Sequence, residues 1–125
     1  MSYITYEVRA YGNGDKHWYQ NGINHRTDGP AIEDVDGDKY WYQNGNLHRT
    51  DGPAVEYSDG SKYWYQNGQR HRTDGPASEC AGGRKYWYLE GEELTEAEFN
   101  ARTKPSCEGK VVEIDGKKYT LVEIV

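Results

Sequence analysis

A period of 23 residues runs through most of the chain and constrains its fold more than any other feature. The residues around each tryptophan recur at this interval, so the chain divides into units 12–34, 35–57, 58–80 and 81–103. The two central units are identical at 17 of 23 positions. A fixed period of this kind is typical of folds in which one small unit stacks on the next. The recurring tryptophans are Trp18, Trp41, Trp64 and Trp87.

Each unit contains two short runs of strand-forming residues. The run Lys-Tyr-Trp-Tyr-Gln at 39–43 is followed by Asn-Gly, and the run Pro-Ala-Val-Glu-Tyr at 53–57 is followed by Ser-Asp-Gly. Short runs bounded by turn residues predict two strands per unit, joined as an antiparallel meander. We expect residues 44–52 to form the loop between them.

The pairing register follows from which side chains can share a face. If Trp41 lies opposite Ala54, then Lys39 lies opposite Glu56. A three-residue turn at 58–60, with Gly60 in the left-handed region, extends this pattern, whereas a two-residue turn would break it. One face is then predicted to alternate Trp with Ala beside a Lys/Glu ladder. The other face is predicted to alternate Tyr with Pro beside a second row: Tyr40, Val55, Tyr63, Ser78 and Tyr86.

The composition indicates how such a sheet is stabilised. Leu, Ile, Val and Phe together supply only 17 of the 125 residues, while the chain has 12 Tyr and 4 Trp. Each aromatic ring can bury about 150–250 Å². Neither face has the continuous aliphatic surface of a two-sheet core. We therefore predict an all-β fold: a single-layer antiparallel meander of 23-residue hairpin repeats, stabilised by stacking of each repeat on its neighbour.

The ends of the chain differ from the repeats. Alternating residues within 1–11 predict a capping strand before the first repeat. In the last repeat, Thr95 and Glu98 form a capping-box pattern and Leu94 and Phe99 a hydrophobic staple, which predicts a short capping helix at about 96–103. Residues 104–125 are predicted to form a C-terminal β-hairpin with Asp115-Gly116 as a type I′ turn.

The formal net charge of −6 limits the classes of partner. Nucleic-acid phosphates and anionic membrane surfaces attract clustered Lys and Arg, so we expect neither as a direct partner. A basic or neutral protein partner fits better. The first residues lack the features of a signal peptide, and Cys80 and Cys107 are too few for a disulfide framework. We expect free thiols and a cytoplasmic location.

The sequence His-Arg-Thr-Asp occurs at 25–28, 48–51 and 71–74. A structural interpretation is that each Asp accepts backbone hydrogen bonds in a tight loop while His and Arg pack over the neighbouring Trp. Ligand contact is a second interpretation. Catalysis is a third, but a nucleophile does not accompany the motif in every unit, so we expect no enzyme. Successive histidines would lie about 10 Å apart, too far to share a metal, and we expect no cofactor.

Positions that vary between matching units are candidates for partner recognition. Aromatic rows can hold adjacent strands or form a docking surface, because Tyr, Trp and Arg concentrate binding energy. The apolar end of the chain is a candidate for oligomerisation through Val122, Ile124 and Val125. The candidate partner-binding residues are Asn24, Leu47, Arg70, His25, His48, His71, Arg26, Arg49, Arg72, Tyr40, Tyr63 and Tyr86.

The core Trp-Tyr-Gln-Asn-Gly-Asn-Leu-His at 41–48 resembles the MORN-repeat family, and its continuation Arg-Thr-Asp-Gly-Pro-Ala at 49–54 resembles a bacterial and phage variant of it. The resemblance covers residues 12–103. It implies a curved single-layer sheet used for protein binding, in some members for lipid contact, with no activity of the repeat itself. A phage origin would imply inhibition of a host defence protein or host enzyme.

Three functions therefore stand as hypotheses. The first is a non-catalytic protein-binding module that occludes its partner stoichiometrically. The second is a nucleotide or small-molecule sponge that uses Arg26, Arg49 and Arg72 together with the aromatic rows. The third is a self-assembling structural protein held together by the C-terminal hairpin.

Overall fold

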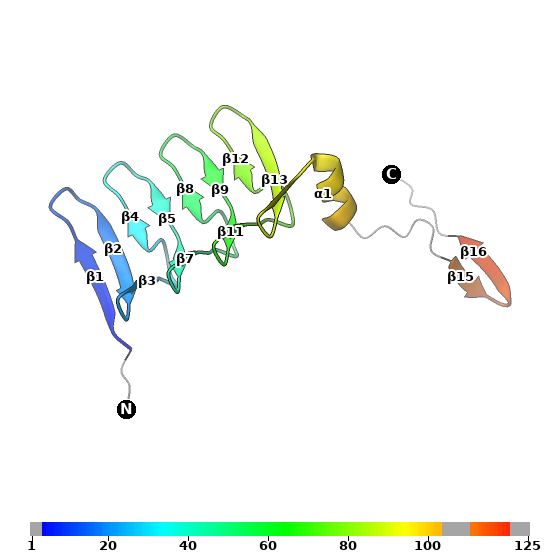
Figure 1. Ribbon diagram of the computed structural model, residues 1–125, viewed down its shortest axis with the longest axis horizontal. Helices are drawn as coiled ribbons and strands as arrows, with labels where there is room; N and C mark the ends of the chain where they lie inside the picture. The colour runs from blue at the N-terminus through cyan, green and yellow to red at the C-terminus, as the bar shows by residue number, and fades with distance from the viewer. Residues whose placement is uncertain (1–3, 104–110, 121–125) are drawn as a thin grey trace.

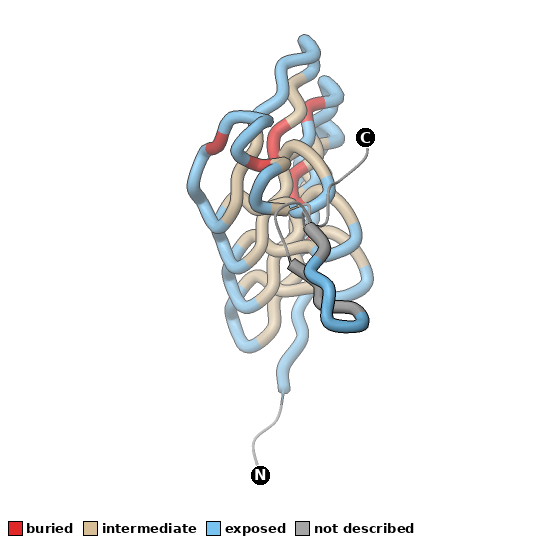
Figure 2. Tube along the Cα trace, turned by 90° about the vertical axis from the view of Figure 1, so that its right-hand side faces the viewer, coloured by how far each residue is buried: buried red, intermediate tan, exposed pale blue. Residues whose placement is uncertain are grey.

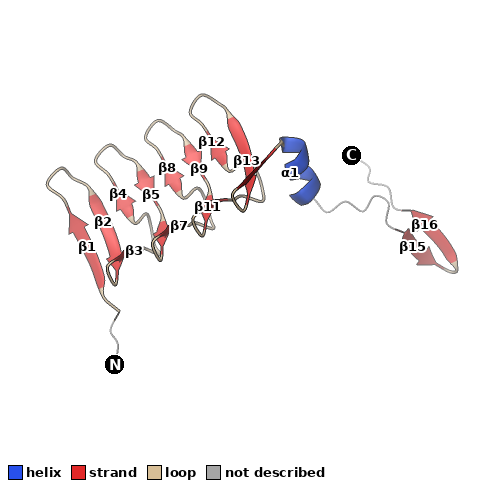
Figure 3. Ribbon diagram, viewed as in Figure 1, coloured by secondary structure: helices blue, strands red, loops and turns tan. Residues whose placement is uncertain are grey.

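A computed structural model describes residues 4–103 and 111–120. The repeats lie side by side as a single antiparallel sheet layer, with helix α1 at one end (Figures 1 and 3). The elements are β1 (Tyr6–Ala10), β2 (Lys16–Gln20), β3 (Ile23–Asn24), β4 (Ile32–Glu33), β5 (Lys39–Tyr40), β6 (Tyr42–Gln43), β7 (Asn46–Leu47), β8 (Val55–Glu56), β9 (Lys62–Tyr63), β10 (Tyr65–Gln66), β11 (Gln69–Arg70), β12 (Ser78–Glu79), β13 (Lys85–Leu89), β14 (Glu92–Leu94), α1 (Glu96–Thr103), β15 (Val111–Ile114) and β16 (Lys117–Thr120).

The main meander has the strand order β1-β2-β4-β5-β8-β9-β12-β13 and confirms the predicted register. Lys39 lies opposite Glu33 on one side and opposite Glu56 on the other. The ladder of alternating charges continues through Lys62 and Glu79 to Lys85. The second predicted row is also present, because Tyr40 pairs with Val55, Val55 with Tyr63, and Ser78 with both Tyr63 and Tyr86.

The turn at 58–60 has the predicted three-residue length. The N–H of Tyr57 donates to the carbonyl of Ser61 at 2.9 Å, and Gly60 has φ +96°, a conformation that L side chains rarely adopt. Consecutive turns are linked by side chains: Asp15 accepts from the N–H of Val35, and Asp38 accepts from the N–H of Ser58, each at 2.7 Å. This edge of the sheet therefore holds neighbouring repeats together.

The prediction of two strands per repeat, separated by a loop at 44–52, is wrong. Residues 42–47 form a tight hairpin of β6 and β7, in which Asn44 and Gly45 have φ +51° and +82°. These positive values are those of a type I′ turn, for which Asn-Gly is the preferred sequence. Tyr42 consequently pairs with Leu47, and the predicted alternation of Tyr with Pro is also wrong.

At the tryptophan, the backbone of each repeat changes its hydrogen-bonding partner from one neighbouring segment to another. The N–H of Trp41 donates to the carbonyl of Ala54 at 2.7 Å, and its carbonyl accepts from the N–H of His48 at 3.0 Å. The hairpins of successive repeats are joined by backbone bonds, as from the N–H of Gly45 to the carbonyl of Asn24 at 3.0 Å. Each repeat is thus bonded to the next along two lines.

Few described residues are fully buried, as expected for one layer (Figure 2). Ala31, Ala54 and Ala77 have no exposed surface, and they occupy the small-residue positions of the predicted Trp/Ala row. The tryptophans themselves are half-buried. The core of the sheet therefore consists of these alanines together with Val55, Ser61 and Ser78.

Helix α1 begins and ends where the sequence predicts. Thr95 and Glu98 exchange the two hydrogen bonds of a capping box, at 3.2 and 3.1 Å, and Leu94 and Phe99 are buried beside it. The first strand, predicted within 1–11, covers Tyr6–Ala10.

Strands β15 and β16 form the predicted hairpin, with φ +51° at Asp115 and +77° at Gly116. The candidate oligomerisation residues Val122, Ile124 and Val125 lie outside the described residues, as does Cys107, while Cys80 is a free thiol. Within 4–103 and 111–120, the structure contains no helix with the length and apolar character needed to cross a bilayer.

Candidate binding surface

Each of the first three repeats builds the same stack of arginine on tryptophan. The guanidinium carbon lies 3.9 Å from the ring centre in the pair Arg26 and Trp18, 4.0 Å in Arg49 and Trp41, and 3.9 Å in Arg72 and Trp64. These distances are well within the range of cation–π attraction. The predicted packing of Arg over Trp is confirmed. We call the surface that carries these stacks the Trp face.

Each guanidinium is also held by groups of its own repeat. In the second repeat, Arg49 donates from Nε to Asp51 at 2.9 Å and from Nη1 to the carbonyl of Pro53 at 3.0 Å. The same Nη1 lies 3.4 Å from Glu56. Equivalent contacts form around Arg26 and Arg72. Only about a fifth of each arginine side chain is exposed, so the stack is a fixed part of the repeat.

The glycine of the Asp-Gly-Pro sequence makes room for this arginine. A Cβ at Gly52 would lie 2.9 Å from the guanidinium carbon of Arg49, closer than real Cβ contacts. Gly29 and Gly75 stand in the same relation to Arg26 and Arg72. The recurrence of glycine here is thus explained by close packing rather than by a positive φ.

The aspartates of the motif have a different partner from the one predicted. The sequence predicts that they accept backbone hydrogen bonds, but Asp28, Asp51 and Asp74 accept from the guanidinium of the arginine two residues earlier. This hydrogen bond and the positive charge hold the pKa of Asp28 and of Asp51 below the usual range. The carboxylates remain 82–83% exposed, so they are available at the rim of the surface.

The histidines also differ from the prediction, which packed them over tryptophan. The Nδ1 atoms of His25, His48 and His71 accept hydrogen bonds from backbone N–H groups of the following repeat, at 3.0, 3.0 and 2.9 Å. The donors are the N–H groups of Asn44, Asn67 and Glu90. Accepting at Nδ1 requires this nitrogen to carry no proton. Each histidine therefore links two repeats.

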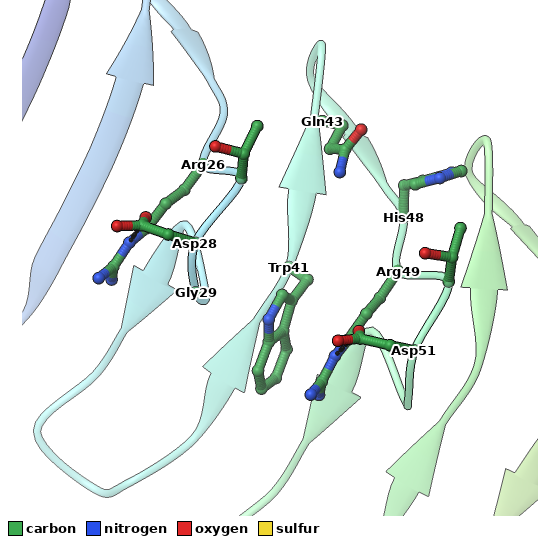
Figure 4. A pocket seen from close by; sticks show the side chains of 10 residues that line it. Arg26, Asp28, Gly29, Trp41, Gln43, His48, Arg49 and Asp51 are labelled. Carbon is green, nitrogen blue, oxygen red and sulfur yellow. Dashed lines mark hydrogen bonds and ion pairs between the residues drawn. The ribbon is translucent and has the colours of Figure 1, made fainter.

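Open pockets lie between successive stacks on the Trp face. The first, of about 380 Å³, is bounded by Arg26, Asp28 and Gly29 on one side and by Trp41, His48 and Arg49 on the other (Figure 4). The second, of about 500 Å³, is lined by the residues 23 positions later, among them Arg49, Trp64 and Asp74. In Figure 4, Trp41 stands between the two Arg-Asp pairs.

A third pocket of about 420 Å³ continues the series at Trp18. In this pocket, Tyr6 and Val8 of β1 occupy the place that the arginine of the preceding repeat occupies in the first two pockets. Sequence reasoning missed several residues of these pockets, notably Gln43 and the exposed Thr27 and Thr50. Their repetition in every unit was the available signal, but identical residues also occur for purely structural reasons.

The other surface, which we call the Tyr face, is defined by Tyr40, Tyr42, Tyr63, Tyr65 and Tyr88. Arg70 lies within it and donates to the hydroxyls of Tyr65 and Tyr88 at 3.1 and 3.2 Å. Burial raises the pKa of Tyr40 to about 12, and it raises the pKa of Tyr42 and Tyr63. Packing within the Tyr face therefore disfavours the ionised form of these phenols.

The variable positions Asn24, Leu47 and Arg70, for which the sequence predicts a loop, lie on strands β3, β7 and β11. They pair with Tyr19, Tyr42 and Tyr65. They are half-buried, whereas Tyr86 is exposed. The candidate residues are thus divided between two surfaces. His25, His48, His71 and the three stacked arginines belong to the Trp face, and the remaining ones belong to the Tyr face.

Several polar groups that line the pockets are hydrogen-bonded within the protein. The Nε and Nη1 groups of Arg49 are engaged by Asp51 and by the Pro53 carbonyl, and the Nδ1 of His48 is engaged by the backbone N–H of Asn67. Across residues 4–103 and 111–120, no three His, Cys, Asp or Glu side chains are gathered as a metal site would require.

Comparisons with protein-family models, with curated proteins and with solved structures found no match to this chain.

Proposed function

We propose that this protein is a non-catalytic protein-binding module and that its Trp face binds an extended segment of a partner polypeptide. The observation that carries the proposal is the recurrence of one pocket, with the same residues, at an interval of one repeat. A single small ligand needs one pocket. A row of equivalent pockets suits a chain that offers a similar group at regular intervals.

The spacing of the pockets supports a polypeptide in the polyproline II conformation. Equivalent positions of neighbouring repeats are two strand spacings apart, about 9.6 Å. One turn of a polyproline II helix contains three residues and advances about 9.3 Å. Every third side chain of such a segment would therefore meet a pocket. Aromatic-lined grooves are the usual receptors for this conformation.

The electrostatics of the Trp face favour a neutral or basic segment over a phosphate-bearing ligand. Arg49 is flanked by the carboxylates of Asp51 and Glu56, and Asp51 is largely exposed. A phosphate approaching Arg49 would meet these carboxylates, and the Nε and Nη1 groups of Arg49 are already bonded to Asp51 and to the Pro53 carbonyl. A basic side chain of the partner could contact both an indole ring and a carboxylate in the same pocket. The nucleotide-sponge alternative receives no comparable support.

A peptide-selection experiment tests this function. Peptides selected from a displayed random library against the full chain are expected to place proline or basic residues at intervals of three. Their binding should shift the indole N–H signals of Trp41 and Trp64 in NMR spectra. Selected peptides that leave these signals unchanged would contradict the proposal.

A pair of matched variants locates the binding site. Thr50→Arg places a long side chain at the junction of two pockets, where Thr50 is exposed, and is expected to weaken binding of a selected peptide at least tenfold. Ser58→Arg makes a similar change at an exposed turn outside these pockets and should leave the affinity unchanged. Equal effects of the two variants would place the site elsewhere.

If the partner is an enzyme of a host cell, inhibition should be stoichiometric and lost in Thr50→Arg.

A further inference from the structure

The two ends of the repeat array are built differently. At the C-terminal end of the array, β14 is followed by helix α1, whose Phe99 is buried (Figure 1). At the other end, β1 is the edge strand of the sheet, and it carries exposed apolar side chains. Tyr6 and Val8 in this strand are 69% and 54% exposed, and Ile4, two residues before it, is 60% exposed. A five-residue edge with exposed apolar side chains is a template for pairing with another strand.

The backbone of β1 shows which of its groups are available. The N–H and carbonyl of Trp18 are both bonded away from β1, to Ala31 and His25. Val8, which lies opposite Trp18, is therefore in a non-hydrogen-bonded pair with β2, so its own N–H and carbonyl point outward. Consistently, the odd-numbered Thr5 and Tyr11 bond toward β2 and its turn. The outward-facing backbone groups are thus those of Tyr6, Val8 and Ala10.

The side chains of β1 select one way of pairing this edge with itself. We propose that two copies of the chain form a dimer in which β1 pairs antiparallel with β1, with Val8 opposite Val8 on the two-fold axis. Tyr6 then lies opposite Ala10, and all three outward-facing residues form hydrogen-bonded pairs. Glu7 lies opposite Arg9 of the other copy, twice in each dimer. Such an isologous contact is self-complementary by symmetry.

Other registers that use the same outward groups are less favourable. A shift in one direction places Glu7 opposite Glu7, and a shift in the other places Arg9 opposite Arg9. Like charges directly opposite each other on paired strands are destabilising. Larger shifts remove backbone hydrogen bonds. Within each copy, Glu7 and Arg9 already form an ion pair at 2.8 Å, so the dimer would join two such pairs into one alternating cluster.

The dimer would also extend the Trp face. Val8 forms part of the pocket at Trp18, and the exposed Tyr6 lies beside it. Pairing about Val8 brings the two Trp18 pockets to either side of the two-fold axis. The apolar side chains of β1 are then covered by those of the second copy, which explains why an edge strand carries them.

Charge reversal tests the dimer and its register in the full-length chain. Sedimentation velocity of the wild-type protein should show a concentration-dependent monomer–dimer equilibrium. Glu7→Arg alone and Arg9→Glu alone each place like charges opposite one another and should weaken self-association about tenfold or more. Mixing the two single variants should restore the dimer, because each then supplies the charges that the other lacks. Circular dichroism checks that both variants are folded.

Three results would overturn the proposal. The first is a wild-type protein that remains monomeric at all concentrations. The second is dimerisation of both single variants with wild-type affinity, which would place the contact on another surface such as the C-terminal hairpin. The third is a mixture of the variants that stays monomeric although both are folded. A second measurement reports the register directly: Val8→Cys should form a disulfide between the two position-8 side chains on oxidation, because hydrogen-bonded antiparallel pairs have Cα atoms about 5.5 Å apart.

Discussion

The guanidinium carbon of Arg49 lies 4.0 Å from the ring centre of Trp41, eight residues earlier in the same repeat. This contact is local, because Asp51, Pro53 and Glu56, which hold the arginine, belong to that repeat as well. Contacts between repeats have other sources, such as the Nδ1 of His48. The repeat is therefore assembled by one set of interactions and joined to its neighbours by another, and substitutions can separate the two.

Arg49→Ala is expected to lower the free energy of unfolding by about 2 kcal/mol. The change removes a cation–π contact and charge-assisted hydrogen bonds from a side chain that is four-fifths buried. Urea denaturation of the full chain measures the effect. Arg84→Ala, at an exposed turn position, is the control and should change stability by less than about 0.5 kcal/mol. Equal effects would mean that the stack contributes nothing specific.

Ala54→Val tests the narrow core of the sheet. Ala54 has no exposed surface, and its backbone is bonded to Trp41 on one side and Tyr63 on the other. Added methyl groups must displace these neighbours, so we expect a loss of about 1–3 kcal/mol. Ala81→Val, at an exposed turn position, is the matched control. A neutral Ala54→Val in thermal or urea unfolding would show that the sheet can open at the alanine row.

Much of this architecture could be predicted from the sequence because each informative residue pattern occurs in several repeats. The Lys/Glu ladder fixed the register, since a slip of one residue would exchange the two faces. The start of α1 is defined by local contacts alone, namely those of Thr95 with Glu98 and the hydrophobic staple of Leu94 and Phe99. In both cases, the interacting residues are close in sequence or repeat strictly.

The hairpin at 42–47 could have been predicted but was not. Asn44-Gly45 is the preferred type I′ sequence, and a long loop that begins at this position pairs Tyr42 with Pro53 instead of with Leu47. The pockets could not have been predicted in the same way. They form between the Asp-Gly-Pro loop of one repeat and the tryptophan of the next, so they depend on how far each loop projects from the sheet.

His48→Ala is expected to loosen one junction between repeats without unfolding either repeat. The N–H of Asn67 loses its acceptor, the Nδ1 of His48, so its amide hydrogen should exchange with solvent several-fold faster. The amide of Asn44 provides an internal control, because it is bonded to His25, which is unchanged. NMR-detected hydrogen exchange measures both amides in one sample. Equal acceleration of the two would indicate global rather than local loosening.

Tyr40→Phe is expected to make the protein less sensitive to alkaline pH. Burial raises the pKa of Tyr40 from 10.0 to about 12 in the folded state. Between these two values, the phenol ionises in the unfolded chain but remains protonated in the folded sheet, so the unfolded state binds fewer protons and stability falls as pH rises. Below pH 10 the phenol is neutral in both states and contributes no pH dependence.

The measurement is the melting temperature of the wild type and of Tyr40→Phe at intervals from pH 9 to pH 12. The wild type should lose more stability than the variant over the upper part of this range, and the two should run parallel below it. Tyr86→Phe removes an exposed phenol from the same row and serves as the control. If Tyr40→Phe and the wild type decline in parallel up to pH 12, the Tyr40 phenol is not shielded from solvent, and the Tyr face is more open than the packing of its side chains indicates.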